Sequence, residues 1–249
     1  MILGIDGTNW VHVLWHAKGG VDVVPAFANR CKALLGSLDF RAAVCCFDRR
    51  SFRHDLLPSY KGTRKAREES LTVALRDCEL AALGLMAVAA EDGCEADDGL
   101  ATLAHVARQQ NEACVIASPD KDLRQCLFGG VKLLRNFLVS DGKPTNGEWY
   151  TSYSLFDEYG LEASQWVDYQ MLVGDRGDAI EGCRGWGDKT ATAALERCKS
   201  IEEMFAKPWS VPCTDRQRGA LIQFRQRSDV VRQLVTLRTD CEAVFDALR

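Results

Sequence analysis

Short apolar runs alternate with amphipathic stretches along the first 150 residues of the chain. The runs of strand length predict buried strands at 2–5, 41–47, 86–90, 113–117 and 131–134. Between them, apolar positions spaced three and four residues apart predict helices at 10–17, 25–38, 70–83, from about 98 to 110, and briefly after 122. Because strands alternate with helices, we expect the α/β class, with a mostly parallel central sheet flanked by helices.

From about residue 150 the pattern changes to helices joined by glycine-rich turns. Helices are predicted at 152–159 and 163–173, and further helices fill the remainder after the glycine-rich stretch 182–191. We therefore expect an α/β domain over 1–150, which includes a basic segment at about 49–72. A helical lobe over 151–249 should share one core with it.

The composition is that of a soluble globular protein, with 47% apolar and 27% charged residues. No run of 18 apolar residues occurs, and the N-terminus lacks the basic and long apolar regions of a signal peptide. These features predict a cytoplasmic protein without a membrane partner. The eleven cysteines include no C-x-x-C pair, so we expect buried free thiols and no zinc site.

The charges are distributed unevenly, although the formal net charge is only −4. Between Arg49 and Arg67 lie seven Lys or Arg residues and one acid, Asp55. Such a segment is either a solvated loop or a surface for phosphate groups. The C-terminal part is also rich in arginine.

Carboxylates gather at the predicted strand ends. In Gly93-Cys94-Glu95-Ala96-Asp97-Asp98, three acids within four residues precede a helix, which is more than capping requires. Other acids follow the strands at 2–5, 41–47 and 113–117, and the carboxyl ends of parallel strands share one sheet edge. Oxygen ligands of this kind suit two Mg²⁺ or Mn²⁺ ions. The candidates are Asp6, Asp48, Glu95, Asp97, Asp98, Asp120, Asp122, Asp175 and Asp178.

Five motifs occur in one order. They are Gly4-Ile5-Asp6-Gly7; Phe47-Asp48 with Tyr60-Lys61-Gly62-Thr63-Arg64; Glu95-Ala96-Asp97-Asp98; Asp120-Lys121-Asp122-Leu123; and Gly174-Asp175 with Asp178, ahead of Gly185-Trp186-Gly187-Asp188. Over roughly residues 1–200 the chain resembles the 5′ nuclease superfamily. Its members are flap endonucleases, bacteriophage 5′–3′ exonucleases and the 5′-nuclease domain of bacterial DNA polymerase I.

The resemblance implies a PIN-like nuclease core with a helical arch and a C-terminal helix–turn–helix DNA-binding lobe. It also implies Mg²⁺-dependent hydrolysis of DNA phosphodiesters near 5′ ends, flaps or junctions, as 5′–3′ exonuclease and flap endonuclease. The nine acids fall on the family's two-metal cluster. Expected partners are DNA with a 5′ single-stranded flap, end or junction, and RNA–DNA hybrids, bound by a monomer.

By position, Lys61 and Arg64 match cations that reach the scissile phosphate. The DNA-binding set implied by the resemblance is Arg53, Tyr60, Lys61, Arg64, Gly185, Gly187, Lys189 and Thr190. For Tyr60, base stacking and packing are both open. The glycine motif also implies a K⁺ held by the main-chain carbonyls of Leu172, Val173, Glu181, Cys183 and Trp186, although Ala179 and Glu181 depart from the usual Asn and Pro.

Two other functions are open from the sequence. One is a structure-selective DNA-binding protein of the same fold whose cleavage is impaired, which the complete acidic set argues against. The other is a compact metal-dependent ribonuclease, which would lack the basic segment and the glycine motif.

Overall fold

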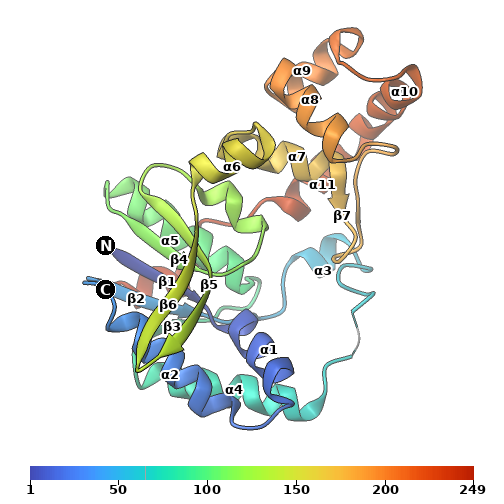
Figure 1. Ribbon diagram of the computed structural model, residues 1–249. Helices are drawn as coiled ribbons and strands as arrows, with labels where there is room; N and C mark the ends of the chain where they lie inside the picture. Colours follow the sequence, from blue (N-terminus) through green and yellow to red (C-terminus); the bar gives the residue numbers. More distant parts are fainter. Residues whose placement is uncertain (65) are drawn as a thin grey trace. The chain divides into compact units, whose positions relative to one another are not determined.

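The computed structural model describes residues 1–64 and 66–249, which form two compact units (Figure 1). The first unit comprises 1–51, 66–151 and 237–249, and the second comprises 52–64 and 152–236. The division at 151/152 lies at the expected end of the α/β domain. However, the last thirteen residues belong to the first unit. Residues 52–64 of the basic segment belong to the second unit. Lys65, one of the seven cations of the basic segment, lies outside the described residues.

A six-stranded sheet with the order β3-β2-β1-β4-β5-β6 forms the centre of the first unit. All its pairings are parallel except that of β5 with β6. The mostly parallel sheet expected from the sequence is therefore confirmed. Its strands are β1 (Ile2–Asp6), β2 (Ala42–Cys46), β3 (Ala87–Ala89), β4 (Cys114–Ala117), β5 (Val131–Ser140) and β6 (Lys143–Tyr150).

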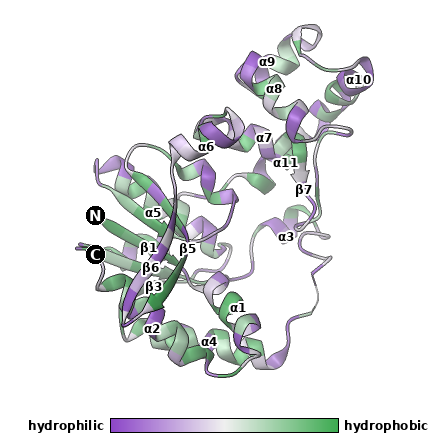
Figure 2. Ribbon diagram, viewed as in Figure 1, coloured by the Kyte–Doolittle hydropathy of each residue, from purple (hydrophilic) through white to green (hydrophobic). Residues whose placement is uncertain are grey.

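Helices cover both faces of this sheet. Alternate residues of β1 point to opposite sides, so they pack against different helices. Leu3 and Ile5 belong to the apolar core formed with α1 (Gly7–Lys18), α2 (Val23–Leu35) and α4 (Glu69–Leu83). A Cβ on Gly4 would lie 2.7 Å from Cδ2 of Leu100, so the other face is occupied by α5 (Ala96–Gln109). The short α12 (Glu242–Ala247) packs beside α5 and β3. Figure 2 colours β1 as hydrophobic, as expected for a strand buried on both faces.

The β5–β6 hairpin was not predicted from the sequence. Its turn is Asp141-Gly142, and both residues have positive φ angles, 52° and 71°. This is the geometry of a two-residue type I′ turn, which the Asp-Gly pair favours. The signal for the hairpin was therefore present in the sequence, although β6 itself has mostly exposed residues.

The second unit is mainly helical, as expected. The predicted helix 163–173 is divided into a 3₁₀ turn, η2 (Ala163–Gln165), and α7 (Trp166–Val173). A short hairpin of β7 (Gly174–Asp175) and β8 (Ile180–Glu181) follows. The other elements are α3 (Arg53–Leu56), α6 (Ser152–Tyr159), α8 (Asp188–Cys198), α9 (Ile201–Ala206), η3 (Pro208–Ser210), α10 (Asp215–Phe224), η4 (Arg225–Arg227) and α11 (Ser228–Val235).

In the basic segment, which was expected to contribute to a helical arch, the described residues form the short helix α3 and the start of α4. Between Leu57 and Glu68, these residues form turns, a bend and irregular backbone. Pro58 and Gly62 in this stretch disfavour a continuous helix. No helix among the described residues is both long enough and apolar enough to cross a membrane.

Candidate metal centre

Asp6 stands where β1 passes directly into α1, and its carboxylate is almost fully buried, with 3% of the residue exposed. Its Oδ1 caps the helix by accepting a hydrogen bond from the backbone N–H of Asn9 at 2.9 Å. Its Oδ2 accepts a hydrogen bond from Oγ of Ser118 at 2.7 Å. Because Ser118 follows the neighbouring strand β4, this bond joins two strand ends of the sheet edge.

Asp48 is held at the end of β2 by hydrogen bonds to two other elements. Its backbone N–H donates to Oγ1 of Thr8 in α1 at 2.8 Å. Its Oδ1 accepts from the backbone N–H of Ala96, the first residue of α5, at 2.8 Å. One carboxylate oxygen of Asp48 thus satisfies a free N–H at the helix N-terminus, where negative charge is also favoured by the helix dipole.

The acids at the start of α5 have different roles. Glu95 is the N-cap residue and forms a capping box with Asp98. Asp98 is fully buried, and its Oδ2 accepts from the backbone N–H of Glu95 while its Oδ1 accepts from the backbone N–H of Arg238, both at 2.9 Å. Asp98, a predicted metal ligand, therefore caps the start of α5 in the structure and also anchors the C-terminal segment.

Asp120 and Asp122 follow β4 in a tight turn. Oδ1 of Asp120 accepts from the backbone N–H of Asp122 at 2.8 Å, and the N–H of Asp120 donates to Oγ of Ser118 at 3.1 Å. Ser118 thus contacts both Asp6 and Asp120, a positioning role that the sequence reasoning missed. Its place directly before Pro119 and Asp120 at a strand end was the available signal.

The carboxylates of the first unit influence one another electrostatically. Burial, and then the charges of Asp120, Asp6, Asp122 and Asp48, raise the pKa of Asp97 well above its usual range. Burial raises the pKa of Asp6 to about 7, against the opposing hydrogen bonds from Asn9 and Ser118. Mutual repulsion of this kind is relieved when a cation binds among the carboxylates.

The donor set fits a hard divalent cation. Oδ1 of Asp97 is buried and has no hydrogen-bond partner among the described residues, although a buried polar atom nearly always has one. It lies in the field of four further carboxylates that supply only oxygen. Mg²⁺ and Mn²⁺ prefer such ligands. The ends of β1, β2 and β4 and the start of α5 supply these carboxylates.

Asp175 and Asp178 belong to the second unit, where they organise the β7–β8 turn. Oδ1 of Asp175 accepts from the N–H of Gly177 at 2.7 Å and from that of Asp178 at 3.3 Å. Asp178 is buried and accepts hydrogen bonds from the guanidinium of Arg64 and, at 3.2 Å, from the hydroxyl of Tyr60. Its backbone carbonyl accepts from the N–H of Lys61 at 3.2 Å. The predicted cations and this predicted ligand are thus brought together.

Two residues predicted to bind DNA are packed inside the second unit. Arg53 is 2% exposed, and its guanidinium donates to the backbone carbonyls of Leu234 at 2.8 Å and Thr236 at 2.9 Å. The structure thus places the guanidinium of Arg53, a predicted DNA-binding residue, at the end of α11, where its charge holds two backbone carbonyls. The ring of Tyr60 is 5% exposed and packs edge-on against His54. Packing, rather than base stacking, is therefore its role here.

The glycine motif forms an exposed turn at the start of α8. Gly185 has a φ of 77°, which favours glycine, and Gly187 is the N-cap of the helix. Gly185, Gly187 and Lys189 are exposed, while Thr190 accepts a hydrogen bond from Gln217 at 3.2 Å. Gly185, Gly187 and Lys189 are therefore exposed around the N-terminus of α8, where the helix dipole favours a phosphate group.

The carbonyls expected to hold K⁺ do not fit that ion well. The guanidinium of Arg227 donates to the carbonyl of Glu181 at 2.9 Å and also to that of Gly182. The carbonyls of Leu172 and Cys183 accept backbone N–H groups. The guanidinium of Arg227 already supplies positive charge at the carbonyl of Glu181, and this charge would repel K⁺.

Comparison with known protein families gives a match along nearly the whole chain. Residues 1–160 match the 5′–3′ exonuclease, N-terminal resolvase-like domain. Residues 161–248 match the 5′–3′ exonuclease, C-terminal SAM fold.

Two groups of curated relatives are similar to the chain. Flap endonuclease Xni of Edwardsiella ictaluri is 30% identical over 245 residues, which are 96% of this chain and 92% of the relative. The thermostable DNA polymerase I of Thermus aquaticus is 33% identical over 214 residues, which are 82% of this chain and 25% of the polymerase. The chain thus spans about a quarter of the polymerase's length.

Among solved structures, T5 5′-exonuclease with bound divalent metal ions (zinc) has a TM-score of 0.83. It is 20% identical in sequence, and the match covers 99% of this chain and 93% of that one. The catalytic core of Rad2 in complex with a DNA substrate has a TM-score of 0.60 at 16% identity, over 96% of this chain and 80% of Rad2. These two likenesses show a shared fold.

Proposed function

The chain belongs to the 5′–3′ exonuclease family of nucleases, and we propose that it is a divalent-metal-dependent 5′ nuclease acting on DNA near 5′ ends, flaps or junctions. The observation that carries the proposal is the unpartnered, buried Oδ1 of Asp97 in the field of four other carboxylates. A buried carboxylate oxygen that no hydrogen bond satisfies does not stabilise the fold by itself. We therefore assign Oδ1 of Asp97 and the carboxylates around it to metal binding.

The ligands that we propose in the first unit are Asp6, Asp48, Asp97, Asp120 and Asp122, with Glu95 at the helix N-terminus. Asp98 supports them by holding the start of α5. Two bound Mg²⁺ or Mn²⁺ ions would activate water and stabilise the charge that develops on the phosphate. The carboxylates would hold the ions, and the hydrogen bonds from Asn9, Ala96 and Ser118 fix the carboxylates in turn.

The family resemblance also assigns Asp175 and Asp178, which belong to the second unit, to the metal ligands. Asp178 is paired with Arg64, so the ion pair must open before Asp178 binds a metal ion or Arg64 reaches a phosphate. We infer that substrate phosphate competes with Asp178 for this guanidinium, because both are anions that Arg binds well. Lys61, whose Nζ lies 5.1 Å from the centroid of the Tyr60 ring, is the second proposed phosphate cation.

The test is cleavage of labelled 5′-flap DNA and of its RNA counterpart, in Mg²⁺, in Mn²⁺ and in EDTA. We expect a metal-dependent cut near the junction of the DNA. Asp97→Asn should reduce the rate by about a hundred-fold or more, because even residues that only support metal ligands cost 10- to 100-fold. It should leave flap binding in Ca²⁺ intact. The exposed Asp92→Asn is the matched control and should cleave normally. Binding without any metal-dependent cut would instead favour a DNA-binding protein with impaired cleavage.

A further inference from the structure

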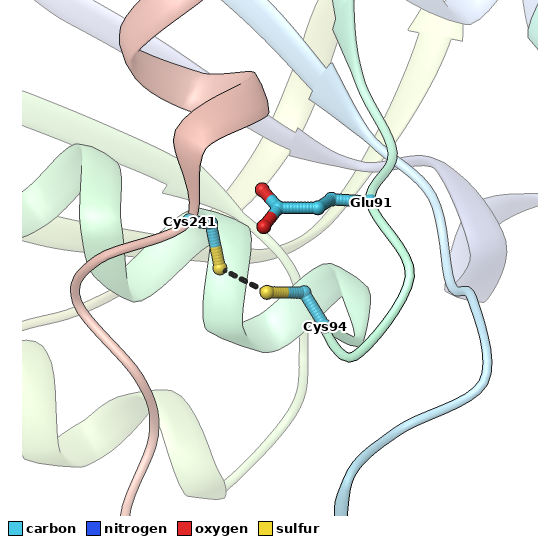
Figure 3. A group of neighbouring side chains, drawn as sticks. All are labelled: Glu91, Cys94 and Cys241. Carbon is cyan, nitrogen blue, oxygen red and sulfur yellow. Dashed lines mark hydrogen bonds between the residues drawn. The ribbon is translucent and has the colours of Figure 1, made fainter.

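Two buried cysteines from distant parts of the sequence meet in the first unit. Cys94 lies in the loop between β3 and α5, and Cys241 directly precedes α12. Their sulfur atoms are 2.6 Å apart, and the two residues are 3% and 1% exposed. Figure 3 shows the two thiols pointing at each other beneath the carboxylate of Glu91. The proposed metal centre uses neither sulfur atom.

The arrangement of Glu91, Cys94 and Cys241 resembles a metal site, because their ligand atoms all lie within 4.8 Å of one another. The distance between the two sulfur atoms argues otherwise. Two thiolates on a tetrahedral zinc ion, each about 2.3 Å from the metal, are about 3.8 Å apart, so the sulfur atoms would have to separate by about 1.2 Å. A disulfide bond is about 2.05 Å long, and the sulfur atoms would approach by only about 0.5 Å.

Glu91 is also occupied in another way. Its Oε2 accepts a hydrogen bond from the backbone N–H of Ala243 in α12 at 2.9 Å. The carboxylate thus holds the same C-terminal segment that carries Cys241. Both observations favour bond formation between the sulfur atoms over binding of a metal ion.

We propose that Cys94 and Cys241 are a site of reversible oxidation and form a disulfide bond with a peroxide as oxidant. The two S–H bonds break and one S–S bond forms, which releases two electrons and two protons. Hydrogen peroxide takes up both as its O–O bond breaks, and two water molecules result. A thiol reductant returns the pair to its reduced form.

The disulfide bond would link the C-terminal segment covalently to the loop that precedes α5. Three backbone N–H groups of this segment already donate to that region: Arg238 to Asp98, Cys241 to Oγ1 of Thr102 at 3.2 Å, and Ala243 to Glu91. A covalent link in the same place keeps these hydrogen bonds and removes freedom from the unfolded chain. Because the cysteines are 147 residues apart, the closed loop is long and the stabilisation should be large.

The experiment uses the full-length wild-type protein, incubated with hydrogen peroxide until its mass is constant or kept with a phosphine reductant. Free thiols are then blocked with N-ethylmaleimide in acid, and the protein is measured intact and as peptides. We expect the oxidised protein to carry two fewer maleimide groups than the reduced one, and a peptide pair that joins Cys94 to Cys241. The oxidised protein should melt about 5–15 °C higher than the reduced one, and the reductant should reverse the shift.

Variants assign the effect to this pair. Cys213 is the most exposed of the cysteines among the described residues, so Cys213→Ser is the matched control and should keep both the peptide pair and the shift in melting temperature. Cys241→Ser should lose both. The wild-type comparison needs no variant, so a poorly folded Cys241→Ser protein would leave the test intact.

Three outcomes would overturn the proposal. One is the absence of the Cys94–Cys241 peptide pair after peroxide treatment, and another is a pair formed with Cys46, which lies in the same crevice. The third is one equivalent of Zn²⁺ that binds the reduced wild-type protein, is lost in Cys241→Ser and blocks oxidation. That result would make the cluster a metal site.

Discussion

Replacing Asp6 by Asn should stabilise the metal-free protein while weakening its response to metal. The side chain is isosteric, so Oδ1 can still accept from the N–H of Asn9, and Nδ2 can meet the hydroxyl oxygen of Ser118. What the substitution removes is a negative charge that is buried beside Asp48 and Asp120.

The magnitude follows from the pKa of Asp6, which burial raises from 3.8 to about 7. Between these pH values the folded protein keeps a proton that the unfolded chain releases. The free energy of unfolding therefore falls as the pH rises through this window, and the full cost is present above pH 7. Three pKa units correspond to about 4 kcal/mol as an upper limit, or about 8–16 °C in melting temperature for a chain of this size.

The assay is thermal unfolding of wild type and Asp6→Asn in EDTA at pH 5 and pH 8, and again with Mg²⁺ at pH 8. We expect the variant to melt higher than wild type in EDTA at pH 8, and by a smaller margin at pH 5, where the folded wild type keeps the proton. Mg²⁺ should raise the melting temperature of the wild type more than that of the variant. The exposed Asp92→Asn should follow the wild type throughout. A variant less stable than wild type at pH 8, or a difference that does not depend on pH, would refute the electrostatic reasoning.

Three further predictions concern residues whose roles the structure changed. Arg53→Met should lower the free energy of unfolding in urea by about 2–4 kcal/mol, because two buried carbonyls lose a charged donor, while the folded protein keeps its affinity for duplex DNA. Asp98→Asn should cost about 1–3 kcal/mol in the same assay, because its amide can replace only one of two acceptors, and the Mg²⁺-induced rise in melting temperature should persist. Wild-type affinity for a duplex, measured by fluorescence anisotropy, should be equal in KCl and NaCl of the same ionic strength, whereas Arg227→Met should bind more tightly in KCl; a preference for K⁺ in the wild type would contradict the role given to Arg227.

The sequence alone predicted the sheet and the acids at its edge, for a physical reason that is local. Each strand is an apolar run, and a polar residue directly after it must emerge at the strand's end. Because parallel strands end at the same edge, Asp6, Asp48 and Asp120 were expected to meet without any knowledge of side-chain positions. The hairpin at Asp141-Gly142 was also encoded locally, although the prediction missed it.

Only the tertiary structure separated the roles of neighbouring residues. Asp97 and Asp98 are adjacent on α5, but side chains of adjacent helical residues point about 100° apart. One therefore faces the carboxylates, while the other meets the backbone of Arg238, 140 residues away in the sequence. The pairing of Arg53 with Leu234, over 181 residues, and of Cys94 with Cys241, over 147, likewise leaves no trace in local sequence patterns. Composition and spacing specify which residues are available for a site, whereas their partners depend on how distant segments pack.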